Sequence, residues 1–431
     1  MTARHALLAD DPRYAEMFDV ARETLAAGGE VYEDLTPRMV ALARQAPVME
    51  GSIAELLGLP AERHQIFEVQ RPHYTLWSFA ACDRALRENE VFSSAVYRES
   101  PGVRRMGENI LSMTGARHRA YRGIVQPKFI RPVVASLWRP RWIQGAVDAL
   151  LDNLHGRERA DLNLELCARL PVHVVSEGIG IGGERALDFR YHLLRATVLA
   201  RNLSPEEIGR SFAVVRTMLQ ELIDARRAEP TDDVMSALVT GSLELPGEDA
   251  RPLTDEEIVA FCLLVMTAGG GTTWRQLGIT LVALLSDYRL WEACREDRSL
   301  VEAAVEESAR WMPTDPTFPR LVMEDVEVEG MRIPAGCRVD MCLATANRDP
   351  SRWDHPDVYD PFRPRQSHLG FGMGPHRCLG MEVAKMEMVL AINGLLERFP
   401  HMTLDPDAPP PRLLGGLHQR GYSAVPVRFN A

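Results

Sequence analysis

The sequence predicts a mainly helical protein with a smaller β portion, an α+β fold built as one large domain around a long central helix. Residues 254–288 have the pattern of one mostly apolar helix, which at about 1.5 Å per residue would extend roughly 50 Å and cross the whole molecule. Two later segments, 326–330 and 338–341, alternate with the period of two that is typical of strands. No linker-like change of composition, repeat or low-complexity block divides the 431 residues, so we expect a single domain over 1–431.

The composition excludes several classes of protein. A net charge of −11 argues against a nucleic-acid partner, and 46 % hydrophobic with 25 % charged residues is ordinary for a globular protein. Charges at Arg4, Asp10 and Asp11 predict that no secretory signal is present, and the longest uncharged run, 258–274, is too short for a membrane span. The 7 cysteines show no paired metal spacing, which fits a reducing cytoplasm. We therefore expect a cytoplasmic protein that binds no membrane, and a monomer.

The first quarter of the chain mixes short strands with helices. Segments 67–69 and 73–78 have strand composition, and 82–90 looks helical. Residues 92–110 carry serine, proline, glycine and arginine without clear periodicity. We predict a long loop there, and long loops in compact domains often bind ligands.

A probable helix at 116–125 carries His118 and Arg122 four residues apart, on one helix face. Two such donors suit a propionate or phosphate group, although most basic pairs at this spacing are solvated surface residues. Further on, Gly178, Gly180 and Gly183 fit the Gly-x-Gly-x-x-Gly fingerprint of dinucleotide sites. We reject that reading because no strand–helix–strand unit surrounds it, and we predict a glycine-rich connection between helices.

The long central helix begins with a capping box, in which Thr254 and Glu257 satisfy each other's backbone N–H groups. The run 258–266 is apolar on every side, so this part should be buried on all faces. Residues 269–271 are three consecutive glycines, each of which costs about 1 kcal/mol in a helix relative to alanine. A local widening that admits a ligand beside the Thr272 hydroxyl explains them better than a purely structural role.

A second capping box, Ser299 and Glu302, is expected to open a helix to about Met312. Within it Glu307 and Arg310 lie three residues apart and can pair. Taken alone such a pair carries no information, because most are solvated.

The stretch 371–380 combines glycines, which allow a tight turn and close approach to a flat partner, with Cys378. Residues 379–399 have the pattern of an amphipathic helix, so Cys378 lies at or just before a helix N-terminus, where a thiolate is favoured over a thiol. An axial haem ligand needs such a thiolate. The alternative is a buried structural cysteine beside a glycine turn.

This stretch resembles the haem-binding loop of the cytochrome P-450 superfamily, Phe-Gly-x-Gly-x-His-x-Cys-x-Gly, at every fixed position. Residues 268–273 are similar to the oxygen-binding groove of the family's central helix, and Glu307, Arg310 and Arg363 match its structural Glu-x-x-Arg clamp. The resemblance is clearest from about Leu253 to the C-terminus.

The resemblance implies a cytochrome P-450 fold, with a β-richer part within about 40–110 and a helical haem core at about 111–400. It makes Cys378 the proximal ligand of haem b and Thr272 the partner of bound O2. It also implies further haem contacts from Phe371, Gly372, Gly380 and Ala268, and propionate contacts from His118, Arg122, Arg320 and His376.

At position 271 the chain departs from the family, which has an acidic residue there that relays protons. Gly271 puts ordinary proton delivery in doubt, and ordered water, Thr272 or a substrate group would have to complete the relay.

The implied activity is monooxygenation: one oxygen atom of O2 enters an apolar small molecule, by hydroxylation. Candidate pocket residues are Leu264, Val265, Thr314 and Phe318, and strands near 417–421 and 425–429 should place a turn close to the substrate. Two alternatives remain, namely a peroxide-driven oxygenase or nitrogen-oxide reductase, and a non-catalytic haem–thiolate sensor or carrier.

No flavin, nicotinamide or iron–sulfur site is recognisable in the sequence. Electrons from NAD(P)H should therefore arrive through a separate ferredoxin or flavodoxin and its reductase. A basic face suits docking of such an acidic carrier, with an ordinary solvated face as the alternative. Its expected members are Arg104, Arg105, Arg117, Arg119, Lys128, Arg363, Arg365 and Arg377.

Overall fold

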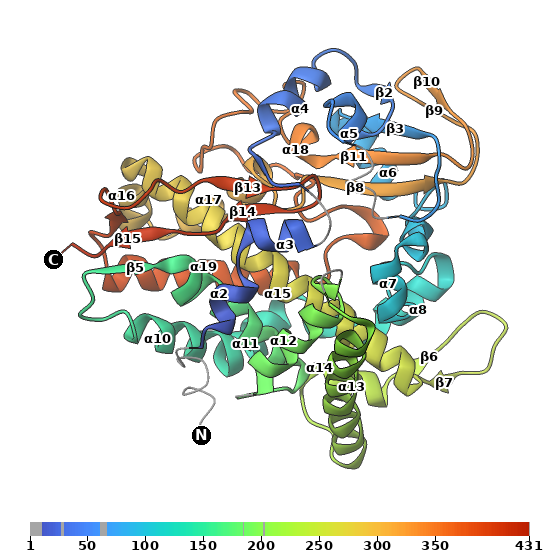
Figure 1. Cartoon of the computed structure of the whole chain (residues 1–431), viewed down its shortest axis with the longest axis horizontal. Coiled ribbons are helices and arrows are strands. Elements are labelled where there is room, and N and C mark those ends of the chain that lie inside the picture. Colours follow the sequence, from blue (N-terminus) through green and yellow to red (C-terminus); the bar gives the residue numbers. More distant parts are fainter. Residues whose placement is uncertain (1–10, 27–29, 61–66, 184, 201–202, 431) are drawn as a thin grey trace.

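The computed structural model describes residues 11–26, 30–60, 67–183, 185–200 and 203–430. A larger helical part surrounds helix α15 (Asp255–Ser286), and a smaller β-rich part lies above it in Figure 1. The predicted mainly helical fold with a smaller β portion is confirmed. Arg4 and Asp10, which support the expectation of no secretory signal, lie outside the described residues.

Most of the helices between residues 144 and 240 lie in the lower half of Figure 1, whereas those between residues 36 and 87 lie in its upper part beside the main sheet. Among the described residues before α15 there are also two π-helical and two short 3-10 segments. In chain order, the helices and segments before α15 are α2 (Arg13–Met17), α3 (Val20–Ala26), α4 (Thr36–Ala43), α5 (Ile53–Leu56), α6 (Phe79–Arg87), η2 (Ser94–Glu99), α7 (Pro101–Met106), α8 (Gly115–Val125), η3 (Gln126–Phe129), α9 (Arg131–Val133), η4 (Val134–Ile143), α10 (Gln144–Asp152), η5 (Asn163–Cys167), α11 (Arg169–Ile179), α12 (Arg185–Ala196), α13 (Pro205–Ala228) and α14 (Val234–Thr240).

The helices after α15 lead to the glycine-rich loop and continue beyond it. They are α16 (Tyr288–Glu296), α17 (Leu300–Trp311), α18 (Leu343–Ala346), η7 (Gly374–His376) and α19 (Met381–Arg398).

The main sheet has five strands in the order β2-β3-β11-β8-β4, in which only the β11–β3 pair is parallel. It joins the first quarter of the chain to a segment more than two hundred residues later, because Arg338 of β11 pairs with His73 of β3. Its strands are β2 (Val48–Glu50), β3 (His73–Leu76), β4 (Phe92–Ser93), β8 (Thr317–Val322) and β11 (Arg338–Cys342).

The remaining strands form small sheets at the edges of the molecule. Strand β1 pairs with β13, so a segment from the first tenth of the chain lies beside one from the last tenth. The strands are β1 (Tyr32–Glu33), β5 (Arg159–Asp161), β6 (Ser242–Leu243), β7 (Arg251–Pro252), β9 (Val326–Val328), β10 (Met331–Ile333), β12 (Thr403–Leu404), β13 (Leu413–Gly415), β14 (Arg420–Tyr422) and β15 (Pro426–Arg428).

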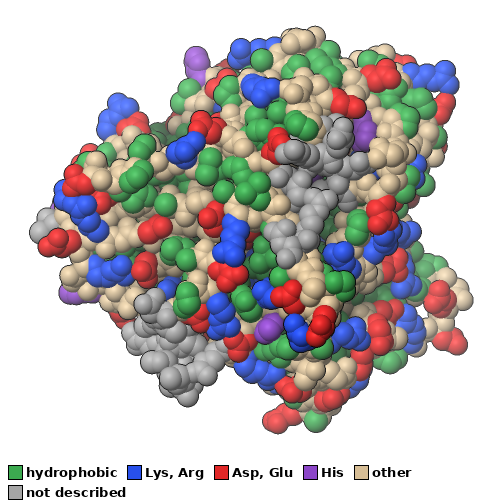
Figure 2. Space-filling view, in the orientation of Figure 1, with side chains coloured by type: hydrophobic (Ala, Val, Ile, Leu, Met, Phe, Trp, Pro, Cys, Tyr) green, Lys and Arg blue, Asp and Glu red, His purple; other side chains and the backbone are tan. Residues whose placement is uncertain are grey.

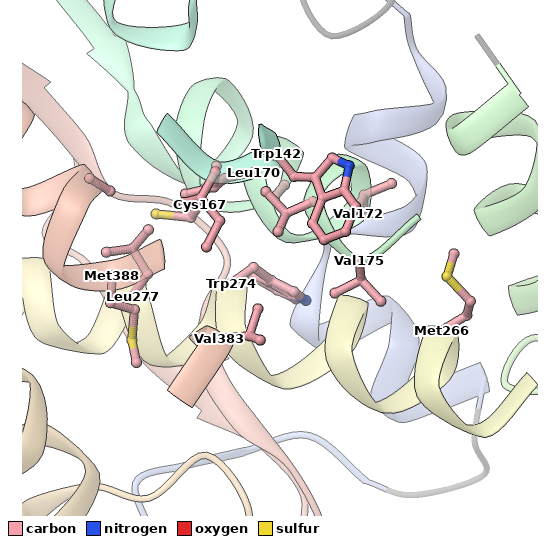
Figure 3. Packing of buried hydrophobic residues seen from close by; sticks show 14 of the residues in the cluster. Trp142, Cys167, Leu170, Val172, Val175, Met266, Trp274, Leu277, Val383 and Met388 are labelled. Atoms are coloured by element: carbon pink, nitrogen blue, oxygen red, sulfur yellow. The ribbon is translucent and has the colours of Figure 1, made fainter. Parts of the chain in front are cut away.

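Helix α15 begins as predicted: the Thr254 side chain accepts from the N–H of Glu257, and the Glu257 carboxylate accepts from the N–H of Thr254. The helix continues unbroken to Ser286. It is long and apolar enough to cross a membrane by length and composition, but 61 % of its most apolar window is buried inside the protein, as in the core helix of a soluble protein. Figure 3 shows Met266 and Trp274 of α15 among Val172 and Val175 of α11, all members of one buried cluster.

The first quarter of the chain corrects two expectations. Residues 67–69 form no strand, because Phe67 packs instead against Tyr97 and under the Arg338 guanidinium. Residues 92–110 are not a long loop: they contain β4, the 3-10 segment η2 and helix α7. Ser93 caps η2 and a proline starts α7, a run of short elements that has no single period.

Strands form where 326–330 and 338–341 predicted them, as β9 and β11, and the two do not pair with each other. Strand β9 pairs with β10 in a separate hairpin, and β11 joins the main sheet between β3 and β8. Glu329 and Gly330 both adopt positive φ, which is the geometry of a tight two-residue hairpin.

The second capping box is also wrong. Ser299 has helical backbone angles and caps nothing, since its N–H and hydroxyl both donate to the Asp297 carboxylate. One apolar face of this helix is buried, namely Val301, Ala304, Val305, Ala309 and Met312. At the other glycine-rich stretch, α11 ends with Gly180 in the left-handed conformation, so the predicted helix–helix connection is confirmed.

Candidate active site

A cavity of about 290 Å³ lies between the middle of α15, the glycine-rich loop before α19 and the start of β8. Its lining is largely apolar. Thirteen of the residues singled out from the sequence line it together: Arg122, Leu264, Val265, Ala268, Thr272, Thr314, Phe318, Arg320, Phe371, Gly372, His376, Cys378 and Gly380.

The glycine-rich loop presents Cys378 to this cavity. Gly372 and Gly374 have φ of +65° and +69°, and a Cβ at Gly374 would meet the carbonyl oxygen of Leu86 at 2.5 Å, so larger residues are excluded there. The Cys378 N–H donates to the Phe371 carbonyl at 2.8 Å, which closes the turn. Six other cysteines are buried in the core, whereas Cys378 is exposed towards the cavity. It is therefore not a structural core cysteine.

The helix N-terminus does not by itself make Cys378 a thiolate. Burial raises the pKa of this thiol above its ordinary value, and the Gly380 N–H and the Arg122 charge only partly oppose that effect. The position is as predicted, since Cys378 lies two residues before Gly380, the N-cap of α19; it is the thiolate expected from that position that the raised pKa opposes. A cation bound to the sulfur is needed to hold it as a thiolate.

One edge of the cavity gathers basic side chains from three elements. His118 of α8 is buried, and its ring lies 4.0 Å, centroid to centroid, from that of His376. Arg122 donates to the carbonyl of Arg377 at 2.6 Å. Arg320 of β8 is buried, donates to the carbonyl of Pro319 and also hydrogen-bonds the Tyr97 side chain. Burial lowers the pKa of His118 to about 4.

Two of these buried groups keep a nitrogen without any hydrogen-bond partner, namely Nε2 of His118 and Nε of Arg320. Buried polar atoms normally have hydrogen-bond partners. The two nitrogens without partners therefore indicate a ligand that presents hydrogen-bond acceptors at this edge of the cavity. A flat apolar group with carboxylate tails, with its centre at the Cys378 sulfur, satisfies the apolar walls, the thiol and the orphaned donors together. The residues present therefore fit a haem.

The middle of α15 gives a structural reason for two of its glycines. A Cβ at Gly269 would meet Val175 at 3.0 Å, and one at Gly270 would meet the Arg190 guanidinium at 3.2 Å. The helix is regular here, so the predicted local widening is wrong. Thr272 faces the cavity, and its hydroxyl donates to the Ala268 carbonyl at 3.1 Å.

Gly271 faces away from the cavity lining, towards two arginines. A Cβ there would lie 3.7 Å from Arg190 and 3.9 Å from Arg275, which is ordinary contact distance. Arg275 pairs with Glu23 of α3 and donates to the carbonyl of Gly271. Glu23 Oε1, Arg190 Nε and Arg275 Nε are all buried without a partner. Three orphaned polar atoms in one cluster indicate bound water between them.

The third predicted group is a buried clamp outside the cavity. Arg310 makes two hydrogen bonds of 2.7 Å to the Glu307 carboxylate and also donates to the carbonyls of Asn347 and Pro356. Arg363 approaches the same carboxylate at 3.4 Å. These contacts join α17 to the segment that leads into the glycine-rich loop.

Gln276 and Glu387, which also line the cavity, were not identified from the sequence. Asp315 lies between the predicted pocket residues Thr314 and Phe318 and lines the cavity with them, but no separate role for its carboxyl was predicted from the sequence. Gln276 accepts from both the N–H and the hydroxyl of Thr314, which fixes that segment against α15. Of the segment 92–110, Ile110 reaches the cavity.

The expected basic face is partly neutralised. Arg104 pairs with Glu68, Arg117 with Glu108, Arg363 with Glu307 and Arg365 with Glu302. Within the part of the chain that the structure describes, Arg105, Arg119 and Arg377 form no ion pair. On the face shown in Figure 2, basic and acidic side chains are interspersed.

Comparison with known proteins gives consistent matches. A family profile described as Cytochrome P450 matches residues 204–424. Cytochrome P450 105C1 of Streptomyces sp is 31 % identical over 90 % of this chain and 100 % of its own length. Cytochrome P450 monooxygenase PikC of Streptomyces venezuelae is 34 % identical over 75 % of this chain and 76 % of its own. The crystal structure of HmtN, a post-tailoring hydroxylase involved in himastatin biosynthesis, superposes with a TM-score of 0.70 at 32 % identity, covering 85 % of this chain and 94 % of that one.

Proposed function

Since the chain belongs to the cytochrome P450 family of monooxygenases, we propose that it holds a haem through Cys378 and hydroxylates an apolar small molecule with O2. The observation that carries this proposal is the single cavity lined by Cys378, Thr272 and Arg320, whose Nε has no hydrogen-bond partner. His118, whose Nε2 also has no partner, is not part of the lining but contacts His376, which is. A haem iron with a thiolate ligand supplies O2 activation when it is bound there.

We propose that the residues of this chain bind the haem, orient the substrate and exclude water from the cavity. His118, Arg122 and Arg320 would hold the carboxylate tails of the haem, and His376 packs against His118 to complete that edge. Leu264, Val265 and Phe318 provide an apolar wall for the substrate. The Thr272 hydroxyl, already hydrogen-bonded to the carbonyl of Ala268, is one of the polar groups that α15 contributes to the cavity, together with Thr273 and Gln276.

Monooxygenation consumes two electrons and two protons, because the second oxygen atom of O2 leaves as water. Without a carboxylate at position 271, we propose that water held by Glu23, Arg190 and Arg275 brings these protons to the α15 groove. Arg275 of this cluster donates a hydrogen bond to the carbonyl of Gly271, one residue before Thr272. The three buried atoms of the cluster that have no hydrogen-bond partner in the protein support this route.

The electrons would come from a ferredoxin-type or flavodoxin-type carrier and its reductase. Arg119 of α8 and Arg377 beside Cys378 are two of the cations of the expected basic face for which the described residues provide no ion-pair partner. An acidic carrier would be steered to them, and charge reversal at Arg119 should raise its apparent KM most strongly at low salt.

The test is the absorption spectrum of the reduced protein under carbon monoxide, for wild type and Cys378→Ala. A red-shifted Soret band that is lost in the variant supports thiolate ligation. A histidine-type band, or failure of the wild type to bind haem, would overturn the proposal.

Gly271 also favours a second candidate, a peroxide-driven oxygenase, since hydrogen peroxide brings its own protons and electrons. Product formation with peroxide should be compared with that supported by reduced ferredoxin. A peroxide-only enzyme would show no turnover with the reduced carrier.

A further inference from the structure

Asp315 places a carboxyl group on the wall of an otherwise apolar cavity. It lies between α17 and β8, next to Thr314 and three residues before Phe318, which line the same cavity. The backbone on both sides of it is fixed. The N–H of Thr314 donates to Gln276 at 3.1 Å, its carbonyl accepts from Arg420 at 3.0 Å, and the Pro316 carbonyl accepts from Ala344 at 3.1 Å. The carboxyl is therefore held in a defined position.

The partners of Asp315 satisfy it only in part. The Gln419 side chain hydrogen-bonds the Asp315 carboxyl. The charges of Arg275 and Arg420 also lower the pKa of this carboxyl, without a hydrogen bond to it. Both arginines direct their own hydrogen bonds elsewhere, Arg275 to Glu23 and Arg420 to Thr36 and the carbonyl of Pro313. Among the residues that the structure describes, none forms an ion pair with Asp315.

Burial raises the pKa of Asp315 to about 6, so most of the carboxyl is ionised at neutral pH. The other acidic residue of the lining, Glu387, is buried so completely that its pKa is raised well above its ordinary value, and it stays neutral. Arg122, Arg320 and His376 act at the His118 edge, which the proposed haem occupies. Asp315 lines the same cavity as Cys378 and Thr272. Its charge thus acts in the cavity where we propose that the substrate reacts.

A buried carboxylate with an incomplete set of partners is costly, and a bound cation offsets that cost. In pockets that are mainly apolar, a few polar groups of this kind fix which ligand binds and how it is oriented. We propose that Asp315 makes this enzyme selective for substrates that carry a basic nitrogen, bound as the cation, with their apolar body against Leu264, Val265 and Phe318. This inference rests on the proposed function and names the substrate class of the same cavity.

The experiment measures binding by calorimetry to the haem-loaded protein at neutral pH. The probes share one apolar skeleton and differ at one end, which is a dimethylamino group, a trimethylammonium group, an alcohol or a neutral tert-butyl group. Both nitrogen ends are positively charged and too crowded to ligate iron. The wild type should bind the two cations at least about ten-fold more tightly than the tert-butyl compound, a difference that corresponds to about 1.4 kcal/mol.

Asp315→Asn keeps the shape of the side chain and removes its charge, and it should reduce this ratio to near one. Asp315→Ser serves the same purpose if the asparagine variant does not fold. Asp325→Asn is the matched control, because Asp325 is a surface residue paired with Arg332. It should bind all four probes as the wild type does.

Three outcomes would overturn the inference. The cation preference could be absent in the wild type, or it could survive in both Asp315 variants. Alternatively, the alcohol could bind as tightly as the amine and lose affinity equally, which would make Asp315 a hydrogen-bond acceptor without charge selectivity. Failure of the proposed function is separate, since it shows as a missing thiolate band in the wild type before any probe is added.

Discussion

His118 on α8 and His376 in the loop before Cys378 face each other, with ring centroids 4.0 Å apart and planes inclined by 34°. His376 exchanges a hydrogen bond with the Ser94 hydroxyl at 3.0 Å, whereas Nε2 of His118 has no partner. Burial keeps both imidazoles neutral, with the pKa of His118 lowered to about 4 and that of His376 to about 2. The pair therefore offers an unused ring nitrogen, not a positive charge, to whatever the cavity binds.

His118→Phe should weaken haem binding while it preserves the ring packing on His376. A hydrogen bond to a charged group contributes about 1.5–3 kcal/mol, so haem should leave the variant roughly ten-fold or more faster. The measurement is the rate of haem transfer to an excess of a haem-binding acceptor protein. Arg119→Gln, one residue along on the exposed face of α8, is the control. Equal transfer rates for His118→Phe and wild type would mean that His118 does not hold the haem.

Arg310→Met should destabilise the folded protein strongly. Arg310 is fully buried and makes two bonds to Glu307, so its removal leaves a buried carboxylate without its main partner. Breaking a buried pair in this way typically costs about 3–5 kcal/mol. The free energy of unfolding in urea measures this, with Arg332→Met as control, because the Arg332–Asp325 pair is exposed and should contribute less than about 1 kcal/mol. Equal losses in the two variants would contradict the assignment of Arg310 as a buried clamp.

Local signals explain which parts of the fold could be predicted. The capping box at Thr254 and the apolar run after it involve neighbours within one helical turn, and α15 begins where they predict. The main sheet could not be predicted in the same way, because β3 and β11 are paired across more than two hundred residues and neither strand specifies its partner. Ser299 shows the limit of a short motif, since Asp297 two residues earlier competes for the same N–H.

The candidate site likewise contains residues that could be predicted from the sequence and residues that could not. The residues that determine the shape of the glycine-rich loop all lie within the ten positions 371–380. Cys378 and its neighbours could therefore be located from the sequence. Glu23 and Arg275 are 252 residues apart, and no local pattern connects them. Asp315 was visible in the chain, but whether a carboxyl faces a cavity or solvent depends on how β8 packs against α15, and a single sequence does not contain that information.

His173 should make stability sensitive to acid. It is buried in α11 with the Tyr14 hydroxyl 2.7 Å away, and burial lowers its pKa from 6.5 to about 4. As pH falls below 6.5 the unfolded chain takes up this proton and the folded protein does not. Stability is therefore fully present above pH 6.5 and is lost towards pH 4, by up to about 1.4 kcal/mol per pH unit.

His173→Gln keeps a hydrogen-bonding side chain and cannot titrate in this range. Its free energy of unfolding should fall less steeply between pH 6.5 and 4 than that of the wild type. His155→Gln, at an exposed site, should follow the wild-type curve. Parallel curves for His173→Gln and wild type would show that another group is responsible for the acid sensitivity.

Gly271→Asp should improve the coupling of electron use to product. The new Cβ has room, and the carboxylate would lie between Arg190 and Arg275, whose charges would keep it ionised. Such a group can hold and pass protons beside the Thr272 turn. The fraction of electrons lost as hydrogen peroxide should therefore fall several-fold, and the solvent isotope effect on turnover should change.

Gly271→Ala adds the Cβ without the acid and should behave as the wild type. If the aspartate variant keeps the wild-type coupling and isotope effect, then this prediction is wrong, and that result counts against a proton relay beside Gly271 that limits coupling.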